Sequence, residues 1–420
     1  MKKMCLVLSF TLILFLLLSC NGINNDHLKA DSRCDFDNPL ECNIYNGSNL
    51  LHYNNGFLYF YNIFPNIPGG QPEGRTLMRL DIKTNLVYPV CSKPQCTHND
   101  LSCVYYGIYP CLYLNNDHVI FTRMVLSLEN GEMGVSNEVV NLINGEKLIR
   151  DSITASSGSI IMKMLFWKDF VYYLSDSSKS EEGISAFRWN LSKNTVEEMK
   201  SFSEPISSEN SEYDFLAFML DNQIYYVWDH TLYSADPDFS NEKIIRKDFD
   251  VLEALTDGEH IYYGVQSDKR EGIETFYMTD PDFRSITPLG ITAETGRVHV
   301  TENWIYYVKY DEISIGKNRV PGYEGDEIIL EGSEIWRCRH DGEGHELVFR
   351  FDGELANTRP LHEIIVGDDI YTLYSYWNDD DQDDVLRDGD QFVSFVGDNF
   401  IIMKIHIPTG EVSYLDGIPD

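Results

Sequence analysis

The sequence predicts an all-β protein in which one strand-forming unit is repeated about seven times. Two observations support this class: the composition favours strands, and a turn followed by an aromatic strand recurs along the chain. The 420 residues include 26 Tyr and 22 Phe but only eight Ala. Alanine is the strongest helix former, whereas aromatic and β-branched residues are enriched in strands. A mainly helical protein is therefore disfavoured.

The recurring strand reads Ile-Tyr-Tyr or a close variant and follows a turn rich in Asn, Asp and Gly. Its first apolar residue occupies seven positions, with a mean step of 52 residues: Leu58, Val119, Val171, Ile224, Ile261, Ile305 and Ile370. Side chains that alternate between two apolar faces after a tight turn indicate a strand covered on both sides.

A second strand follows most copies, ends in a polar turn and precedes another short strand. Two of these turns, Asp236–Phe239 and Asp280–Phe283, both read Asp-Pro-Asp-Phe and lie 44 residues apart. Asp at the first position and Pro at the second favour a type I turn. Identical turns at matching points of two repeats indicate internal duplication.

Repeats of roughly 40–60 residues with about four strands each are typical of β-propeller blades. A parallel β-helix would show a much shorter period, and a two-sheet sandwich would not need seven copies. We therefore predict a β-propeller domain of seven blades over residues 45–420, with six or eight blades as alternatives. The last blade is expected to be completed by strand material from near residues 40–52.

The N-terminus has the features of an export signal. Met1–Lys3 is basic, Leu6–Leu18 is almost wholly apolar, and the segment ends in Leu17-Leu18-Ser19-Cys20. An apolar run of this length is too short to span a bilayer comfortably, because a spanning helix needs about 20 residues.

The ending of this segment resembles the lipobox of bacterial lipoprotein signal peptides, which reads Leu-x-(Ser/Ala/Gly)-Cys. The resemblance implies that residues 1–19 are a signal peptide and that Cys20 carries a diacylglycerol. The polar residues 20–44 then form a tether between lipid and domain. An uncleaved N-terminal anchor is the alternative.

The charge of the chain restricts its partners. There are 33 basic and 67 acidic side chains, a net charge of −34. Because phosphate binding needs basic patches, this balance argues against a nucleic-acid partner and against adhesion of the domain surface to anionic lipid. We expect the protein on the extracytoplasmic face of the cell membrane, attached through its N-terminal lipid only.

The Ile-Tyr-Tyr strands, together with strands of the form Leu/Ile-x-Arg-x-Asp, resemble those of TolB-type and quinoprotein-like bacterial propellers. They are more similar still to uncharacterised β-propeller lipoproteins of Gram-positive bacteria that carry a domain of unknown function. The resemblance covers about residues 45–418. It implies the fold but no particular activity, because propellers share such repeats across many activities.

One local motif stands out among the cysteines. Cys91, Cys96, His98 and Cys103 follow the spacing Cys-x4-Cys-x-His-x4-Cys, which supplies the three thiolates and one imidazole of a structural zinc site. The same spacing occurs in the lipoproteins named above. Outside the cytoplasm, disulfides are the alternative, and we favour them over zinc. Cys338, in a strand-like run, is expected to remain unpaired. Either chemistry makes this segment a structural clasp.

An acidic stretch near the C-terminus suggests a calcium site at Asp379, Asp381 and Asp383. An EF-hand loop requires Gly at its sixth position and Glu at its twelfth. Those positions hold Asp384 and Asp390, so a solvated acidic loop is favoured. The sequence lacks the nucleophile elbow, the Walker loop, the dinucleotide-binding glycine motif and the zincin motif.

Two functions of different class remain. The favoured one is a non-catalytic binding or scaffold propeller that presents loops to a protein, peptide or glycan. The alternative is an extracytoplasmic enzyme that acts on glycans or peptides through residues at the central channel. His, Arg and carboxylates gathered at the channel mouth would favour the enzyme, whereas apolar and small side chains would favour the binder.

Overall fold

The structure, a computed structural model, describes the following residues: 51–63, 75–93, 95–96, 103–107, 112–115, 118–126, 133–142, 145, 147–149, 164–176, 184–202, 217–249, 251, 253–266, 273–294, 296–317, 326–351, 360–376 and 399–415. The chain divides into two compact units, Met1–Arg33 and Cys34–Asp420, and every described residue belongs to the second. The predicted signal peptide (1–19) and tether (20–44) lie outside the described residues.

The described residues form seven antiparallel sheets. The first sheet contains β1 (Leu51–Asn54), β2 (Phe57–Ile63), β3 (Arg75–Asp81), β4 (Leu86–Pro89) and β5 (Tyr106–Gly107). The second contains β6 (Leu112–Asn115), β7 (His118–Leu126), β8 (Met133–Asn141) and β9 (Lys147–Ile149). The third contains β10 (Met164–Trp167), β11 (Phe170–Asp176), β12 (Ile184–Asn190) and β13 (Thr195–Phe202). The fourth contains β14 (Ala217–Leu220), β15 (Gln223–Trp228), β16 (Thr231–Ala235) and β17 (Lys243–Lys247).

The remaining three sheets have the same strand order. The fifth contains β18 (Glu253–Thr256), β19 (Ile261–Gln266), β20 (Ile273–Thr279) and β21 (Ile286–Glu294). The sixth contains β22 (Val298–Val300), β23 (Ile305–Lys317), β24 (Asp326–Cys338) and β25 (Glu346–Arg350). The seventh contains β26 (Pro360–Val366), β27 (Asp369–Tyr376), β28 (Asn399–His406) and β29 (Glu411–Leu415). In the described part of the chain, no helix is long and apolar enough to cross a membrane.

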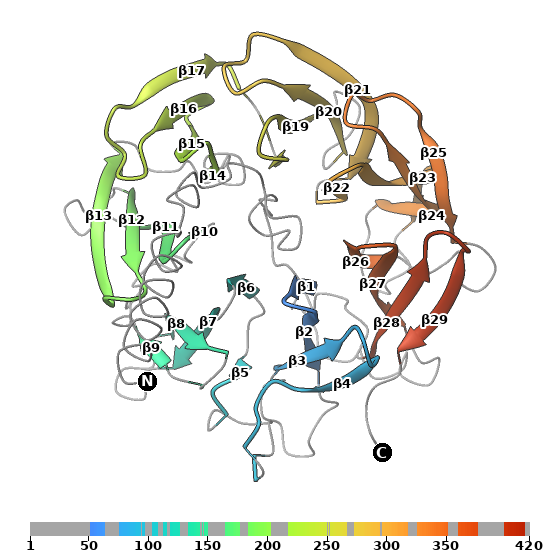
Figure 1. The fold of residues 1–420 in the computed structure, drawn as a ribbon, viewed down its shortest axis with the longest axis horizontal. Coiled ribbons are helices and arrows are strands. Elements are labelled where there is room, and N and C mark those ends of the chain that lie inside the picture. Colours follow the sequence, from blue (N-terminus) through green and yellow to red (C-terminus); the bar gives the residue numbers. More distant parts are fainter. Residues whose placement is uncertain are drawn as a thin grey trace, which may run out of the picture. The chain divides into compact units, whose positions relative to one another are not determined.

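Within this unit, consecutive sheets lie side by side in chain order, and the first sheet lies beside the seventh (Figure 1). The first strand of each sheet is here called the inner strand. Several inner strands contact those of neighbouring sheets: β1 contacts β6 and β26, and β14 contacts β10 and β18. The core is divided among the spaces between sheets. Leu58 of the first sheet, for instance, packs in one buried cluster with Tyr371 of the seventh.

The turn residues predicted from the sequence have the backbone conformations that tight hairpins require. Asn55 and Gly56, between β1 and β2, have positive φ values of 49° and 83°. Positive φ at both central residues defines the type I′ turn, for which Asn-Gly is the preferred sequence. The duplicated Asp-Pro-Asp-Phe turns are also confirmed as equivalent: Phe239 and Phe283 donate backbone hydrogen bonds to Asp236 and Asp280, at 2.8 and 2.9 Å.

Duplication extends to side-chain contacts across the sheets. Arg188 stands opposite Tyr172 on one neighbouring strand and opposite Glu197 on the other, with which it forms an ion pair at 2.7 Å. Arg337 repeats this arrangement in the sixth sheet, between Tyr306 and Glu346. Arg188 and Arg337 therefore each link the second, third and fourth strands of their own sheets.

The expected completion of the last sheet by residues near 40–52 is wrong for the part of that segment that the structure describes. β1 begins at Leu51 and pairs with β2, as the inner strand of the first sheet. The seventh sheet has four strands of its own, all between residues 360 and 415. The first and seventh sheets are joined by side-chain packing: Leu51 and Leu58 share a buried cluster with Tyr371 and Ile402.

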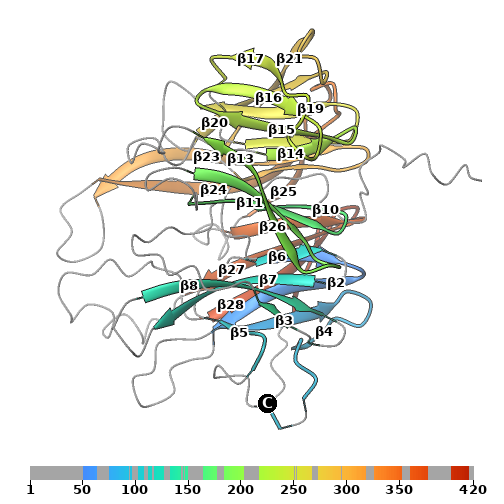
Figure 2. The ribbon, with the colours of Figure 1, turned by 90° about the vertical axis from the view of Figure 1, so that its left-hand side faces the viewer.

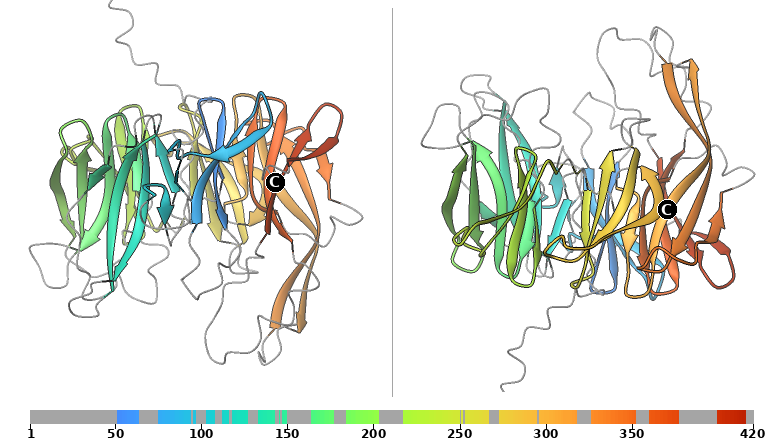
Figure 3. Two further views of the ribbon diagram at one scale, coloured as in Figure 1. Left: turned by 90° about the horizontal axis from the view of Figure 1, so that it is seen from below. Right: turned by 90° about the horizontal axis from the view of Figure 1, so that it is seen from above.

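One hairpin is much longer than the others. β23 and β24 have 13 residues each, and their pairing continues out to Lys317 opposite Asp326. Figures 2 and 3 show this two-stranded ribbon projecting beyond the neighbouring strands of the sixth sheet.

Candidate functional site

The cysteine segment is an insertion in the outer strand of the first sheet. β4 and β5 both pair with β3, on successive stretches of it, so the chain leaves β3 after Pro89 and returns at Tyr105. Leu77 holds both ends: its carbonyl accepts a hydrogen bond from the Val90 amide and its amide donates to the Tyr105 carbonyl, each at 3.1 Å. The segment thus joins two strands that belong to the first sheet.

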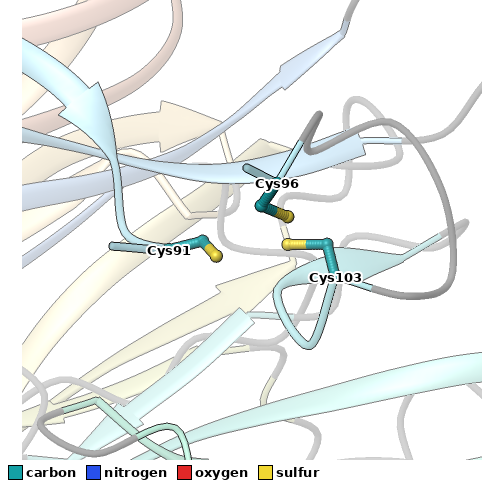
Figure 4. A group of neighbouring side chains, drawn as sticks. All are labelled: Cys91, Cys96 and Cys103. Carbon is teal, nitrogen blue, oxygen red and sulfur yellow. The ribbon is translucent and has the colours of Figure 1, made fainter. Parts of the chain in front are cut away.

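Three thiols gather at the base of this insertion. The sulfur atoms of Cys91, Cys96 and Cys103 all lie within 4.8 Å of one another, and none of the three forms a disulfide within the described chain. Figure 4 shows the three side chains directed toward a common point. The fourth residue of the predicted ligand set, His98, lies outside the described residues.

The surroundings of these thiols are apolar. Cys91 and Cys103 are buried in a cluster formed by the first and second sheets, with Tyr59, Leu77 and Val119 among its members. Burial raises the pKa of Cys103 to about 12, and the neighbouring cysteines add to this effect. In this environment the Cys103 thiol carries no charge at neutral pH unless a cation compensates for it.

Of the other residues singled out from the sequence, the structure describes one. Cys338, expected to be unpaired, is a buried free thiol at the end of β24. The proposed lipidation residue Cys20 and the calcium candidates Asp379, Asp381 and Asp383 lie outside the described residues.

A second group of chemistry-bearing side chains, which no motif in the sequence marks, lies on or beside the inner strands. Arg297, directly before β22, donates two hydrogen bonds from Nη1 to the carboxylate of Glu363 on β26, at 2.9 and 2.8 Å. His299 Nε2 lies 3.9 Å from the same carboxylate. All three residues are buried, and together they connect the sixth sheet with the seventh.

Two buried carboxyl groups face each other in the fifth sheet. Glu253 of β18 accepts a hydrogen bond from the Gly296 amide at 2.8 Å. Burial raises its pKa well above the usual range, and the nearby Glu274 raises it further. Glu274 lies over Gly264, where a Cβ atom would come within 1.8 Å of a carboxylate oxygen. The absence of a side chain at Gly264 therefore makes room for Glu274.

Asp257 links the fifth and sixth sheets near the turn that follows β18. It accepts hydrogen bonds from the Tyr262 hydroxyl at 2.7 Å and from the His260 amide at 2.6 Å. Burial opposes its ionisation, but these hydrogen bonds outweigh that effect and lower the pKa of Asp257. His340 Nδ1 lies 3.5 Å from the same carboxylate, and its Nε2 donates to the Thr301 carbonyl.

A weak sequence signal marked this second group. Glu253 and Glu363 are single charged residues inside short apolar strands, a few positions before a repeated turn. A lone charge in a buried strand needs a partner. The sequence could have indicated that partners exist, but not which residues they are, since Arg297 and Glu363 are 66 positions apart.

Comparisons with known proteins identify the fold. No protein-family model and no curated protein matches the sequence. Among solved structures, the chain is similar to the β-propeller domain of the Trilobed protease from Pyrococcus furiosus, with a TM-score of 0.52, 10% identity and coverage of 90% of this chain and 96% of that one. That domain is noted for an open velcro topology.

Two further similarities are weaker. A candidate 6-phosphogluconolactonase from Bacteroides uniformis has a TM-score of 0.46 and 12% identity, with coverage of 85% of this chain and 94% of that one. The acylaminoacyl peptidase of Pyrococcus horikoshii has a TM-score of 0.40 and 11% identity, with coverage of 81% and 59%. The similarity to the Pyrococcus furiosus domain, together with the seven antiparallel sheets, shows that the chain folds as a β-propeller.

Proposed function

We propose that the chain is a seven-bladed propeller lipoprotein, anchored through Cys20 on the extracytoplasmic face of a membrane. In this proposal it acts as a non-catalytic binding or scaffold domain for a protein, peptide or glycan. The seven sheets support the blade number. The lipobox-like sequence Leu17-Leu18-Ser19-Cys20 supports the anchor.

The observation that carries the non-catalytic role is that the buried arginine beside β22 and the buried carboxylate on β26 are paired with each other. Arg297 and Glu363 are 7% and 1% exposed, and each satisfies the other. A catalytic acid, base or nucleophile must come within hydrogen-bond reach of its substrate. The inner strands thus contain the residue types that an enzyme would need, but those residues are buried and serve to join sheets.

The enzyme remains the second candidate because of one specific feature, the carboxyl pair of Glu253 and Glu274. A carboxyl group whose pKa is raised by burial and by a second carboxyl is typical of catalytic acids in glycan and peptide hydrolysis. Both groups are buried between the fifth and sixth sheets. A substrate could reach them only if that interface opened.

Hydrolysis assays on the full-length chain separate the two candidates. The probes are fluorogenic aminoacyl amides and 4-methylumbelliferyl glycosides, tested with wild type and with Glu253→Gln. We expect both proteins to release fluorophore at the rate of buffer. Turnover by the wild type that Glu253→Gln abolishes, while Glu302→Gln at an exposed carboxyl retains it, would overturn the non-catalytic role.

A further inference from the structure

We propose that Cys91, Cys96 and Cys103 bind one metal ion of the zinc class, which fixes the insertion to the first sheet. The proposal rests on the convergence of three sulfur atoms within 4.8 Å of one another. A tetrahedral zinc site with Zn–S bonds of about 2.3 Å separates its sulfurs by roughly 3.8 Å. Only a small contraction of the observed cluster is needed.

The backbone places two of the ligands independently of any metal. Val90 and Tyr105 are both hydrogen-bonded to Leu77, so the two ends of the insertion are held on one residue of β3. Cys91 directly follows one end, and Cys103 lies two residues before the other. The Cys96 amide donates a hydrogen bond to the Lys93 carbonyl at 3.1 Å, and this turn brings Cys96 toward the other two cysteines.

A metal ion accounts for the convergence of three thiols better than a disulfide does. A disulfide joins two sulfurs, so any pairing within the cluster leaves the third thiol buried beside the bond. A metal ion engages all three at once. Thiolate ligands select zinc and other soft or borderline metals over magnesium or calcium. A divalent cation would also compensate for thiolate charge inside the apolar cluster around Tyr59 and Leu77.

The test is the metal content of the full-length chain, extracted in detergent without added metal. We expect about one equivalent of zinc per chain, as in a structural site. Cys96→Ser and Cys103→Ser should each reduce this content several-fold. Cys338→Ser, which removes a buried thiol of the sixth sheet, is the matched control and should retain the full equivalent. Cobalt exchanged into the wild type should give the visible bands of a tetrahedral thiolate site.

A second measurement keeps the proposal testable if the serine variants fail to fold. In the wild type, alkylation of the three cysteines is followed before and after removal of metal by a chelator. Alkylation that rises after chelation and falls again when zinc is restored supports the site. Cysteines that react only after reduction are in disulfides, and this result overturns the proposal. So does metal-free protein whose free thiols take up neither zinc nor cobalt.

Discussion

Arg297 and Glu363 form a buried ion pair that joins the sixth sheet to the seventh, with both carboxylate oxygens bonded to one guanidinium nitrogen. Arg297 directly precedes β22, the inner strand of the sixth sheet, whereas Glu363 lies in the middle of β26, the inner strand of the seventh. Because both partners are almost fully removed from solvent, the pair affects stability mainly through what happens when one partner is removed.

Arg297→Ala should therefore destabilise the fold by about 3–5 kcal/mol, because it leaves the Glu363 carboxylate buried without its guanidinium. Urea unfolding followed by tryptophan fluorescence measures the change. Arg284→Ala is the control, since Arg284 forms an exposed ion pair with Asp282 and should have little effect. A double variant, Arg297→Met with Glu363→Leu, should recover most of the loss. If Arg297→Ala matched wild type, the pair would not be a structural link.

Glu253 should make stability depend on pH. Its pKa is raised in the folded state by burial and by Glu274, so the folded protein retains a proton that the unfolded chain loses near pH 4.5. The stabilisation that the folded state gains from holding this proton is fully present below that pH. It is lost as the pH rises through the folded-state pKa of Glu253. Glu253→Gln removes this titration. The stability of the variant relative to wild type should therefore increase as the pH rises above about 4.5.

Thermal unfolding of both proteins across that pH range measures the difference. Glu302→Gln, which neutralises an exposed carboxyl, is the matched control. A difference between wild type and Glu253→Gln that stays constant with pH would show that Glu253 ionises normally in the folded state.

Gly264→Ala should destabilise the fifth sheet. The added methyl group would come within 1.8 Å of Glu274 Oε2, so the buried carboxyl group would have to move. In a Glu274→Ala background the same substitution should cost much less, because the two closest atoms are gone and only Phe276 Cζ, at 3.0 Å, remains near the added methyl group. Chemical denaturation of the four proteins gives the coupling between the two positions. Equal costs in both backgrounds would contradict the close approach of Glu274 to Gly264.

Phe239→Ala should weaken the contact between the third and fourth sheets. The Phe239 ring lies 6.4 Å from the ring of Tyr172 and 5.4 Å from that of Tyr226, and it is buried. Removing a buried Phe side chain costs about 3–5 kcal/mol. Ile244→Ala, at an exposed position of β17, is the control and should change stability little. Denaturant midpoints measured with unchanged m-values provide the comparison.

Cys20→Ala should release the protein from membranes or leave an unprocessed precursor, because the proposed lipid attachment would be lost. Fractionation and metabolic labelling with palmitate measure this. Cys338→Ser is the control and should stay membrane-bound and labelled. Palmitate that persists in the Cys20→Ala protein would contradict the anchor.

The repeated sheets could be predicted from the sequence because their signals are local. Asn55 and Gly56 form the turn beside the strands they connect, and the Asp236–Phe239 turn closes through a hydrogen bond within four residues. The insertion at Leu77 could not be placed, since nothing in residues 90–105 indicates that β4 and β5 pair with the same strand. The same limit applies to the buried charges. A lone Glu363 predicts a partner, but only the packing of two sheets identifies Arg297.

The packing of the first sheet against the seventh has a consequence for the order of folding. Each sheet is formed by one continuous stretch of chain, so each can form soon after its own residues are synthesised. The face of the first sheet that carries Leu51 and Leu58 must wait for Ile402 and its neighbours. At roughly 5–20 residues per second, the 344 residues from Leu58 to Ile402 take on the order of 20–70 s to synthesise. During that interval this apolar face is open to aggregation or chaperone binding.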